Sequence, residues 1–142
     1  MEITTLEQGS DVTEFTLFGQ CSDPRVRQGA KAIMRAYGLD GKPFGLIAVP
    51  GGAIGNGVFE YVEFFHRQRK VDRCILSVHP DCLWAKAHGM TPEQVHQRMH
   101  EVAEQVRTLG ILKVQLHVIS NNGAHVNCAH GHAHLELLAA NQ

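Results

Sequence analysis

The sequence has no excess of either charge sign and no long apolar run. Lys and Arg number 13 against 14 Asp and Glu in 142 residues, which gives a formal charge of −1. Proteins bind a phosphate backbone through clustered Lys and Arg, so this balance argues against a nucleic-acid partner. No apolar run approaches the ~20 residues that a helix needs to cross a bilayer, so no membrane partner is expected.

The beginning of the sequence lacks the features of a secretory signal. Residues Met1–Thr5 read Met-Glu-Ile-Thr-Thr, without the basic segment and the apolar segment that a signal peptide requires. The sequence also has only four Cys. In a protein without a secretory signal, Cys residues are expected as free thiols or metal ligands rather than as disulfides. These absences predict a cytoplasmic protein.

Predicted strands alternate with predicted helices along the chain. Strands are expected over 12–20, 44–49, 74–78 and 112–119, and helices over 24–37, 58–65 and 91–108. The continuously apolar run Phe44–Val49 is typical of a central parallel strand covered on both faces. No linker or repeat divides the chain. We therefore expect residues 1–142 to form a single α/β domain, with three layers around a mainly parallel sheet of about four to five strands.

Two short motifs combine the residue types that bind metal and carry out chemistry. The first is Cys21–Arg25 (Cys-Ser-Asp-Pro-Arg) and the second is His79–Cys82 (His-Pro-Asp-Cys). Two Cys and one His form the ligand set of a catalytic zinc that keeps one coordination position open. Cys21 and His79 both fall at the carboxyl ends of predicted strands, where parallel sheets place their binding crevices.

Asp23 and Arg25 are the candidate catalytic residues of the first motif. If Cys21 ends a strand, the alternation of side chains points Asp23 and Arg25 to the same side as the Cys21 thiolate. A metal, a carboxylate and a guanidinium in one pocket indicate hydrolytic or hydration chemistry. Taken singly, each residue has a structural alternative: Cys21 as a buried thiol, Asp23 as a helix N-cap and Arg25 as a solvated residue.

These motifs together resemble the signatures of the β-class carbonic anhydrases. Cys21–Val26 is similar to the family's Cys-x-Asp-x-Arg motif, and His79–Cys82 is similar to its His-x-x-Cys motif. Between them, Val49–Ala53 resembles the family's Asn-Ala-Gly loop, and Glu60–Tyr61 resembles a Glu-Tyr pair of the family. The resemblance covers Phe15–Gly89 and indicates a short form of the family.

The resemblance implies a Zn²⁺ ion held by Cys21, His79 and Cys82, with Asp23 and Arg25 as the catalytic dyad. The implied enzyme is a zinc lyase (carbonate dehydratase) that hydrates carbon dioxide reversibly to bicarbonate with a zinc-bound hydroxide. Relatives that hydrolyse carbon disulfide or carbonyl sulfide on the same site provide one alternative, and a non-catalytic zinc-binding homologue provides another. Family members assemble as dimers or multiples of dimers, so a homodimer or higher homo-oligomer is expected.

The sequence departs from the family pattern at the expected pocket wall. Leu83 follows the second Cys where the family usually has Gly, and Pro50 stands where the central loop usually has Asn. We expect Gly51, Gly52 and Leu83 to form the substrate pocket beside the metal. These departures leave the ligand set intact and bear on which small linear molecule is the substrate.

Histidine is the compositional outlier, with 10 residues, several of them within the C-terminal segment 125–134. If this segment is extended, His130, His132 and His134 line one face of a strand and could bind a second metal. The alternative is the polar face of an edge strand or a flexible tail.

Overall fold

The computed structural model describes residues 14–120 and 125–127 of the chain. They form a five-stranded sheet in the order β2-β1-β3-β4-β5, in which the first four strands are parallel and β5 is antiparallel to β4. In chain order the elements are β1 (Thr16–Cys21), the 3₁₀ turn η1 (Pro24–Val26), α2 (Arg27–Ala36), β2 (Gly45–Val49), the 3₁₀ turn η2 (Gly52–Ile54), α3 (Val58–Gln68), β3 (Arg73–Val78), α4 (Leu83–Ala87), α5 (Pro92–Arg107), β4 (Lys113–Ile119) and β5 (His125–Asn127). The predicted α/β fold with a mainly parallel sheet is confirmed.

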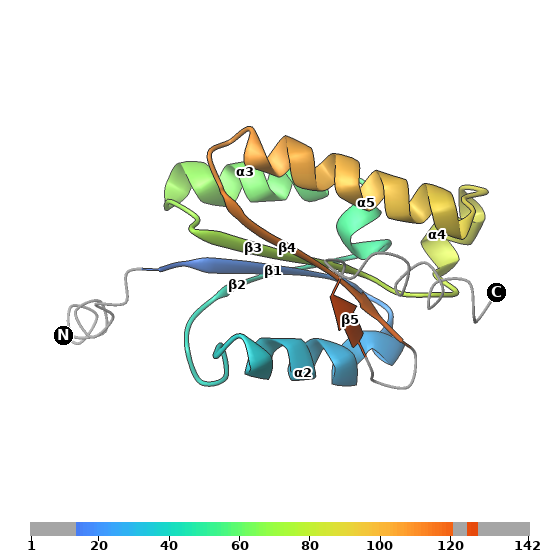
Figure 1. Cartoon of the computed structure of the whole chain (residues 1–142), viewed down its shortest axis with the longest axis horizontal. Helices are drawn as coiled ribbons and strands as arrows, with labels where there is room; N and C mark the ends of the chain where they lie inside the picture. Colours follow the sequence, from blue (N-terminus) through green and yellow to red (C-terminus); the bar gives the residue numbers. More distant parts are fainter. Residues whose placement is uncertain (1–13, 121–124, 128–142) are drawn as a thin grey trace.

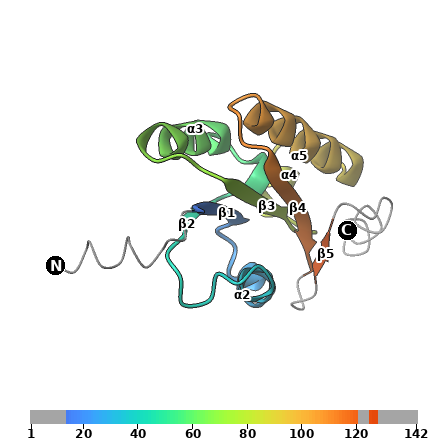
Figure 2. The same cartoon turned by 60° about the vertical axis from the view of Figure 1, so that its left-hand side comes forward.

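Helices cover both faces of the sheet and so make three layers. Helix α2 lies on one face and helices α3 and α5 lie on the other (Figure 1), an arrangement that the turned view also shows (Figure 2). The central strand β3 accounts for this arrangement, because Cys74–Val78 is buried throughout. A strand without a polar face is stable only where helices exclude water from both sides of the sheet.

Helix α5 is specified by its own sequence. The Thr91 hydroxyl accepts a hydrogen bond from the Gln94 N–H, and the Gln94 side chain accepts one from the Thr91 N–H, which completes a capping box. Pro92 occupies the first turn, where its missing N–H costs no hydrogen bond. The buried side chains recur every three or four residues along one face: Val95, Met99, Val102, Ala103 and Val106. The helix predicted from Thr91 is confirmed.

The position predicted for the strand Phe44–Val49 is wrong. Strand β2 forms in this segment, but it lies at the edge of the sheet and pairs with β1 alone among the described strands. Leu46 is 50% exposed and Ala48 is also exposed. An apolar run indicates that a segment favours burial, but it does not indicate how many neighbouring strands pair with that segment.

Other elements also differ from the sequence-based expectation. The helix expected over 24–37 begins as the 3₁₀ turn η1 and becomes α-helical only at Arg27, since the first turn of a helix often tightens into 3₁₀ geometry. Helix α4 was not expected, because its five residues are too few to show a helical period. The first strand is observed from Thr16, and residues 12 and 13 lie outside the described residues.

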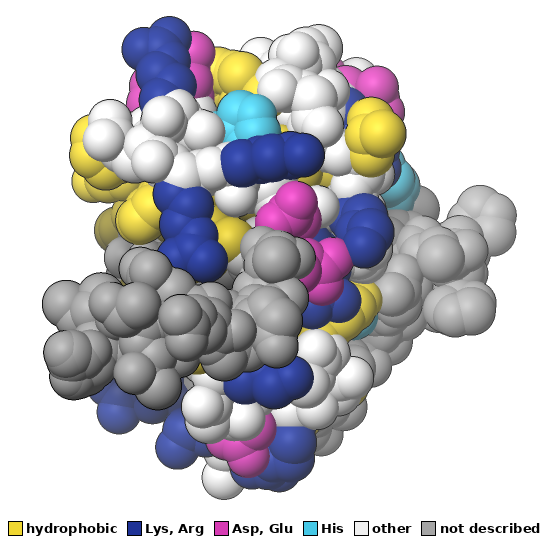
Figure 3. Space-filling view, turned by 90° about the vertical axis from the view of Figure 1, so that its left-hand side faces the viewer, with side chains coloured by type: hydrophobic (Ala, Val, Ile, Leu, Met, Phe, Trp, Pro, Cys, Tyr) yellow, Lys and Arg dark blue, Asp and Glu magenta, His cyan; other side chains and the backbone are white. Residues whose placement is uncertain are grey.

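No helix in the part of the chain that the structure describes has the length and apolar character needed to cross a membrane. The face of the molecule drawn in Figure 3 carries acidic and basic side chains interspersed with uncharged ones. On this face, neither sign of charge forms a continuous stripe.

Candidate metal centre

Cys21, His79 and Cys82 meet at the carboxyl edge of the sheet. Cys21 is the last residue of β1, His79 follows β3 directly, and Cys82 is the N-cap of α4. Strands β1 and β3 are parallel neighbours, so their carboxyl ends lie side by side. One candidate ligand atom from each of the three residues lies within 4.8 Å of the other two. The predicted proximity of the two motifs is therefore observed.

The environment of His79 fits a metal ligand. Its side chain is buried, and neither ring nitrogen has a hydrogen-bond partner among the described residues. A buried imidazole without partners is unfavourable, because folding removes it from water without replacing its hydrogen bonds. A metal ion bound by one nitrogen of His79 and by the two thiolates would remove this cost. The donor set of two sulfurs and one nitrogen is one that zinc accepts with an open fourth position.

Cys21 is poised as a thiolate by its neighbours. Its Sγ atom accepts a hydrogen bond of 3.4 Å from the backbone N–H of Gly51. Contact with Cys82 lowers the pKa of the Cys21 thiol, and His79 lowers it further. The same contact with Cys21, together with burial, raises the pKa of Cys82. A cation bound between the two sulfurs would favour loss of the thiol proton of Cys82.

Gly51 is the position that brings a backbone N–H to the Cys21 sulfur. Its φ of +91° lies in the left-handed region, which glycine adopts without steric cost. A Cβ atom at Gly51 would come within 3.0 Å of the Trp84 ring and 3.0 Å of the Gly55 Cα. The indole of Trp84 thus packs on the loop that donates to Cys21, and Trp84 stacks in turn on His88 with 4.0 Å between ring centroids.

Asp23 lies beside the three candidate ligands and is held there by Arg25. Asp23 is the N-cap of η1, and its Oδ1 atom accepts a 2.8 Å hydrogen bond from the Arg25 backbone N–H. The Arg25 side chain donates to the same carboxylate through Nε, at 3.1 Å to each oxygen, and through Nη2, at 2.7 Å to Oδ2. These bonds lower the pKa of Asp23 to about 2, so the group is a carboxylate near neutral pH. Its Oδ2 atom lies 3.9 Å from Nε2 of His79.

Asp23 and Arg25 lie beside the candidate ligands, but not through the strand alternation that the sequence argument used. Strand β1 ends at Cys21, so strand alternation does not extend to either residue. The N-cap turn and the 3₁₀ turn that follows bring the two side chains together instead. The proposed alternative role of Asp23 as a helix cap is also observed, and it coexists with the position beside the metal ligands.

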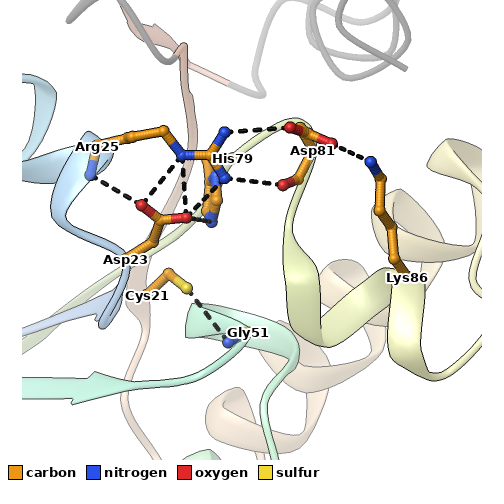
Figure 4. A network of polar contacts seen from close by, with 7 residues as sticks. All are labelled: Cys21, Asp23, Arg25, Gly51, His79, Asp81 and Lys86. Atoms are coloured by element: carbon orange, nitrogen blue, oxygen red, sulfur yellow. Dashed lines mark hydrogen bonds and ion pairs between the residues drawn. The ribbon is translucent and has the colours of Figure 1, made fainter.

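Asp81 and Lys86 complete a chain of charges that the sequence analysis missed. Arg25 donates to Asp81 Oδ2 through Nη1 at 3.1 Å, and to the Asp81 carbonyl oxygen through Nη2 at 3.0 Å. Lys86 forms an ion pair with the other carboxylate oxygen of Asp81. Figure 4 shows Arg25 lying between the two carboxylates, with Lys86 beyond Asp81. The sequence does show an acidic residue, Asp81, inside the second motif. It does not show that Asp81 pairs with Arg25, which lies 56 residues earlier in the first motif.

A cavity of about 630 Å³ opens beside this group of residues. Its wall combines polar residues of the two motifs with apolar residues of the neighbouring loops: Cys21, Ser22, Asp23, Pro24, Arg25, Pro50, Asp81, Leu83 and Trp84. Leu83, predicted as a pocket residue, lines the cavity and is 71% exposed. Gly51 and Gly52 are buried behind the wall, and the central loop contributes Pro50 to the lining instead.

A groove of about 770 Å³ lies apart from these residues, between the edge strand β2 and helix α3. Its lining is mainly apolar and includes Leu46, Tyr61 and Phe64, all at least half exposed. Glu60 is the only acidic residue in this lining, which contains no Cys or His. The residues of the two motifs therefore line the smaller cavity and not this groove. The predicted second metal site at His130, His132 and His134 lies outside the described residues.

Comparison with known proteins supports the fold but not the reaction. No protein-family model matches the sequence, and no curated protein matches it either. The crystal structure of a carbonic anhydrase from Streptococcus mutans has a similar fold, with a TM-score of 0.52 over 88% of this chain and 93% of that chain. The two sequences are 12% identical, so this likeness establishes the fold alone. The chain has a carbonic-anhydrase-like α/β fold with a buried Cys-His-Cys group that could hold a metal.

Proposed function

We propose that the protein is a zinc-dependent enzyme that hydrates carbon dioxide reversibly to bicarbonate. One observation carries the proposal: a buried imidazole without a hydrogen-bond partner among the described residues lies within 4.8 Å of two cysteine thiols, beside a cavity lined by the Asp23 carboxylate. Cys21, His79 and Cys82 would hold the metal. A bound zinc ion supplies Lewis acidity, which lowers the pKa of a water molecule in its open position towards neutrality.

Asp23 would orient the reacting water. Its pKa of about 2 keeps it ionised near neutral pH, so it acts there as a hydrogen-bond acceptor. Arg25 occupies both carboxylate oxygens from one side and fixes the direction in which the remaining lone pairs point. Such positioning is effective because the acceptor is already in place before the reaction begins.

The charge balance of the cavity favours a neutral substrate. Arg25 donates its Nε–H, both Nη2 hydrogens and one Nη1 hydrogen to Asp23 and Asp81. Only one of its five N–H donors therefore remains for an anionic substrate. Pro24, Pro50, Leu83 and Trp84 supply apolar wall. A small, uncharged, linear molecule such as carbon dioxide meets both conditions.

Hydrolysis of carbon disulfide or carbonyl sulfide on the same residues is the second candidate. The observation that favours it is the size of the apolar wall, because Leu83 and the Trp84 indole both line the cavity. A broad apolar wall suits the larger and more polarisable sulfur analogues, since dispersion attraction grows with contact area. Both candidates need the same ligands and the same carboxylate.

We propose that the expected homodimer or higher homo-oligomer forms through contacts at the groove between β2 and α3. There, a strand edge that pairs with no further strand among the described residues lies beside half-exposed apolar side chains (Leu46 and Phe64). An exposed apolar edge of this kind favours association with another chain. Light scattering on Leu46→Glu beside the wild type tests this assignment: a smaller particle in the variant supports it, and an unchanged mass contradicts it.

The function is tested by measuring zinc content and carbon dioxide hydration on the same preparations. We expect about one zinc per chain and stopped-flow hydration above the buffer rate, with Asp23→Asn lowering kcat about 100-fold or more. Glu63→Gln is the matched control, because it removes an exposed carboxylate that pairs with Arg67 away from the cavity. Fully zinc-loaded wild type without hydration would rule out the first candidate. Turnover of a sulfur analogue would then support the second, and no turnover of either would indicate a non-catalytic zinc protein.

A further inference from the structure

The Arg25 guanidinium is held from two opposite sides. Asp23 accepts from Nε and Nη2 on one side, and Asp81 accepts from Nη1 and Nη2 on the other. The two acceptors come from different strand ends, since Asp23 follows β1 and Asp81 follows β3. The contacts to Asp81 therefore link the segment after β1 to the segment after β3, as Figure 4 shows.

Asp81 makes these contacts from an unusual backbone conformation. At φ +57°, it is the one non-glycine residue with positive φ within 14–120 and 125–127. A side chain in this region strains the backbone, although Asp and Asn tolerate it better than other residues. The conformation reverses the chain between His79 and Cys82, which lets both point to one centre. Glycine would adopt this conformation without strain. The turn alone therefore does not explain why residue 81 is an aspartate.

The carboxylate is itself held in place by Lys86. Lys86 pairs with Oδ1 of Asp81, while Arg25 pairs with Oδ2. Charges therefore alternate along Asp23, Arg25, Asp81 and Lys86, and each residue in the middle is held by an opposite charge on both sides. Without Asp81, the half-exposed Arg25 side chain would be held by Asp23 alone, from one side of the guanidinium.

We propose that Asp81 is a positioning residue that holds the Arg25 guanidinium in the orientation in which it orients Asp23. Asp81 does not touch the reacting atoms in this role. It fixes the plane of the guanidinium, and the guanidinium fixes the carboxylate whose Oδ2 lies 3.9 Å from His79. The consequence for turnover rests on the proposed function, whereas the orientation of Arg25 does not.

The test compares two substitutions at Asp81 that keep the turn. Asp81→Gly keeps the positive φ and removes the acceptor, whereas Asp81→Asn keeps the turn and one neutral side-chain acceptor. The readout is the Nε–H resonance of Arg25 in NMR spectra of the zinc-loaded protein, assigned by its loss in Arg25→Lys. We expect faster solvent exchange of this proton in Asp81→Gly, with partial protection restored in Asp81→Asn. Glu63→Gln removes a carboxylate from another arginine ion pair and should leave the Arg25 signal unchanged.

Kinetics and metal content complete the test. Zinc stoichiometry should be unchanged in Asp81→Gly, while kcat falls about 10–100-fold, as expected for loss of an outer-shell partner, and KM stays close to the wild-type value. An Arg25 signal as protected in Asp81→Gly as in the wild type overturns the inference. Loss of protection in a protein that shows no hydration activity supports the inference and contradicts the proposed function, so the two failures are distinguishable.

Discussion

The Ser77 hydroxyl donates a 2.7 Å hydrogen bond to the carbonyl oxygen of Gly19, which links β3 to β1. These are the two strands whose ends carry His79 and Cys21. Both partners are buried, and the bond lies two residues before each of the two ligands. It fixes the spacing of the strands immediately below the candidate metal centre.

Removal of this hydroxyl should cost stability without removing the metal. Ser77→Ala is expected to lower the free energy of unfolding by about 1 kcal/mol, the typical net value of a buried hydrogen bond, as measured by urea denaturation. Thr108→Ala is the matched control, because it removes an exposed hydroxyl-to-carbonyl bond to Gln105, and its effect should stay within about 0.5 kcal/mol. Equal effects in the two variants would contradict the structural role of Ser77.

Metal removal should destabilise the protein through His79 and the two thiolates. A ligand at 1,000 times its Kd stabilises the native state by about 4 kcal/mol, so chelation should lower Tm by several degrees. Adding zinc back should restore the Tm. The Cys82→Ser variant should show a much smaller shift on either treatment. A wild-type Tm that is indifferent to chelator and to zinc would contradict metal binding at this centre.

Cys74 should be chemically inert while the protein is folded. Burial raises the pKa of its thiol to about 12, and only the thiolate reacts with alkylating agents. Because the pKa is raised, the reactive thiolate is almost absent from the folded protein at pH 8. Mass spectrometry after iodoacetamide treatment at pH 8 should find Cys74 unmodified in the folded state and modified in urea. Rapid modification in the folded state would show that this strand is open to solvent.

Gly51→Ala should destabilise the protein more than Gly38→Ala does. Both glycines have positive φ, at +91° and +72°, so alanine at either position incurs a backbone cost on the order of 1–2 kcal/mol. A Cβ at Gly38 meets nothing within 4 Å, whereas at Gly51 it meets Trp84 and Gly55 at 3.0 Å. Urea denaturation of both variants gives the difference between their free energies of unfolding. This difference measures how tightly Trp84 packs against the loop that contains Gly51. No difference would mean that the Gly51 loop moves freely.

Leu83→Ala should change substrate preference with little effect on stability. Leu83 is highly exposed but lines the cavity, so its loss should alter the ratio of carbon dioxide to carbon disulfide turnover up to about 10-fold. The free energy of unfolding should change by less than about 0.5 kcal/mol. Leu112→Ala removes an equally exposed leucine that does not line the cavity. If the wild type and both variants show the same ratio, Leu83 does not contact the substrate.

The sequence by itself determined the class of fold and the identity of the candidate ligands. Alternating strands and helices predicted the parallel sheet, and the capping residues of α5 predicted where that helix begins. Cys21, His79 and Cys82 could be chosen because few residue types bind zinc and because strand ends are where parallel sheets bind ligands. These features are local in the sequence, so local patterns were enough to find them.

The tertiary structure alone decided which partners these residues have. β2 lies at the edge of the sheet because strand pairing depends on the whole chain, and its apolar sequence is the same in either position. Asp81 reaches Arg25 across 56 residues, and the packing around His79 leaves its ring nitrogens without hydrogen-bond partners among the described residues. Such relationships join distant segments through burial and charge, and no pattern within one segment records them.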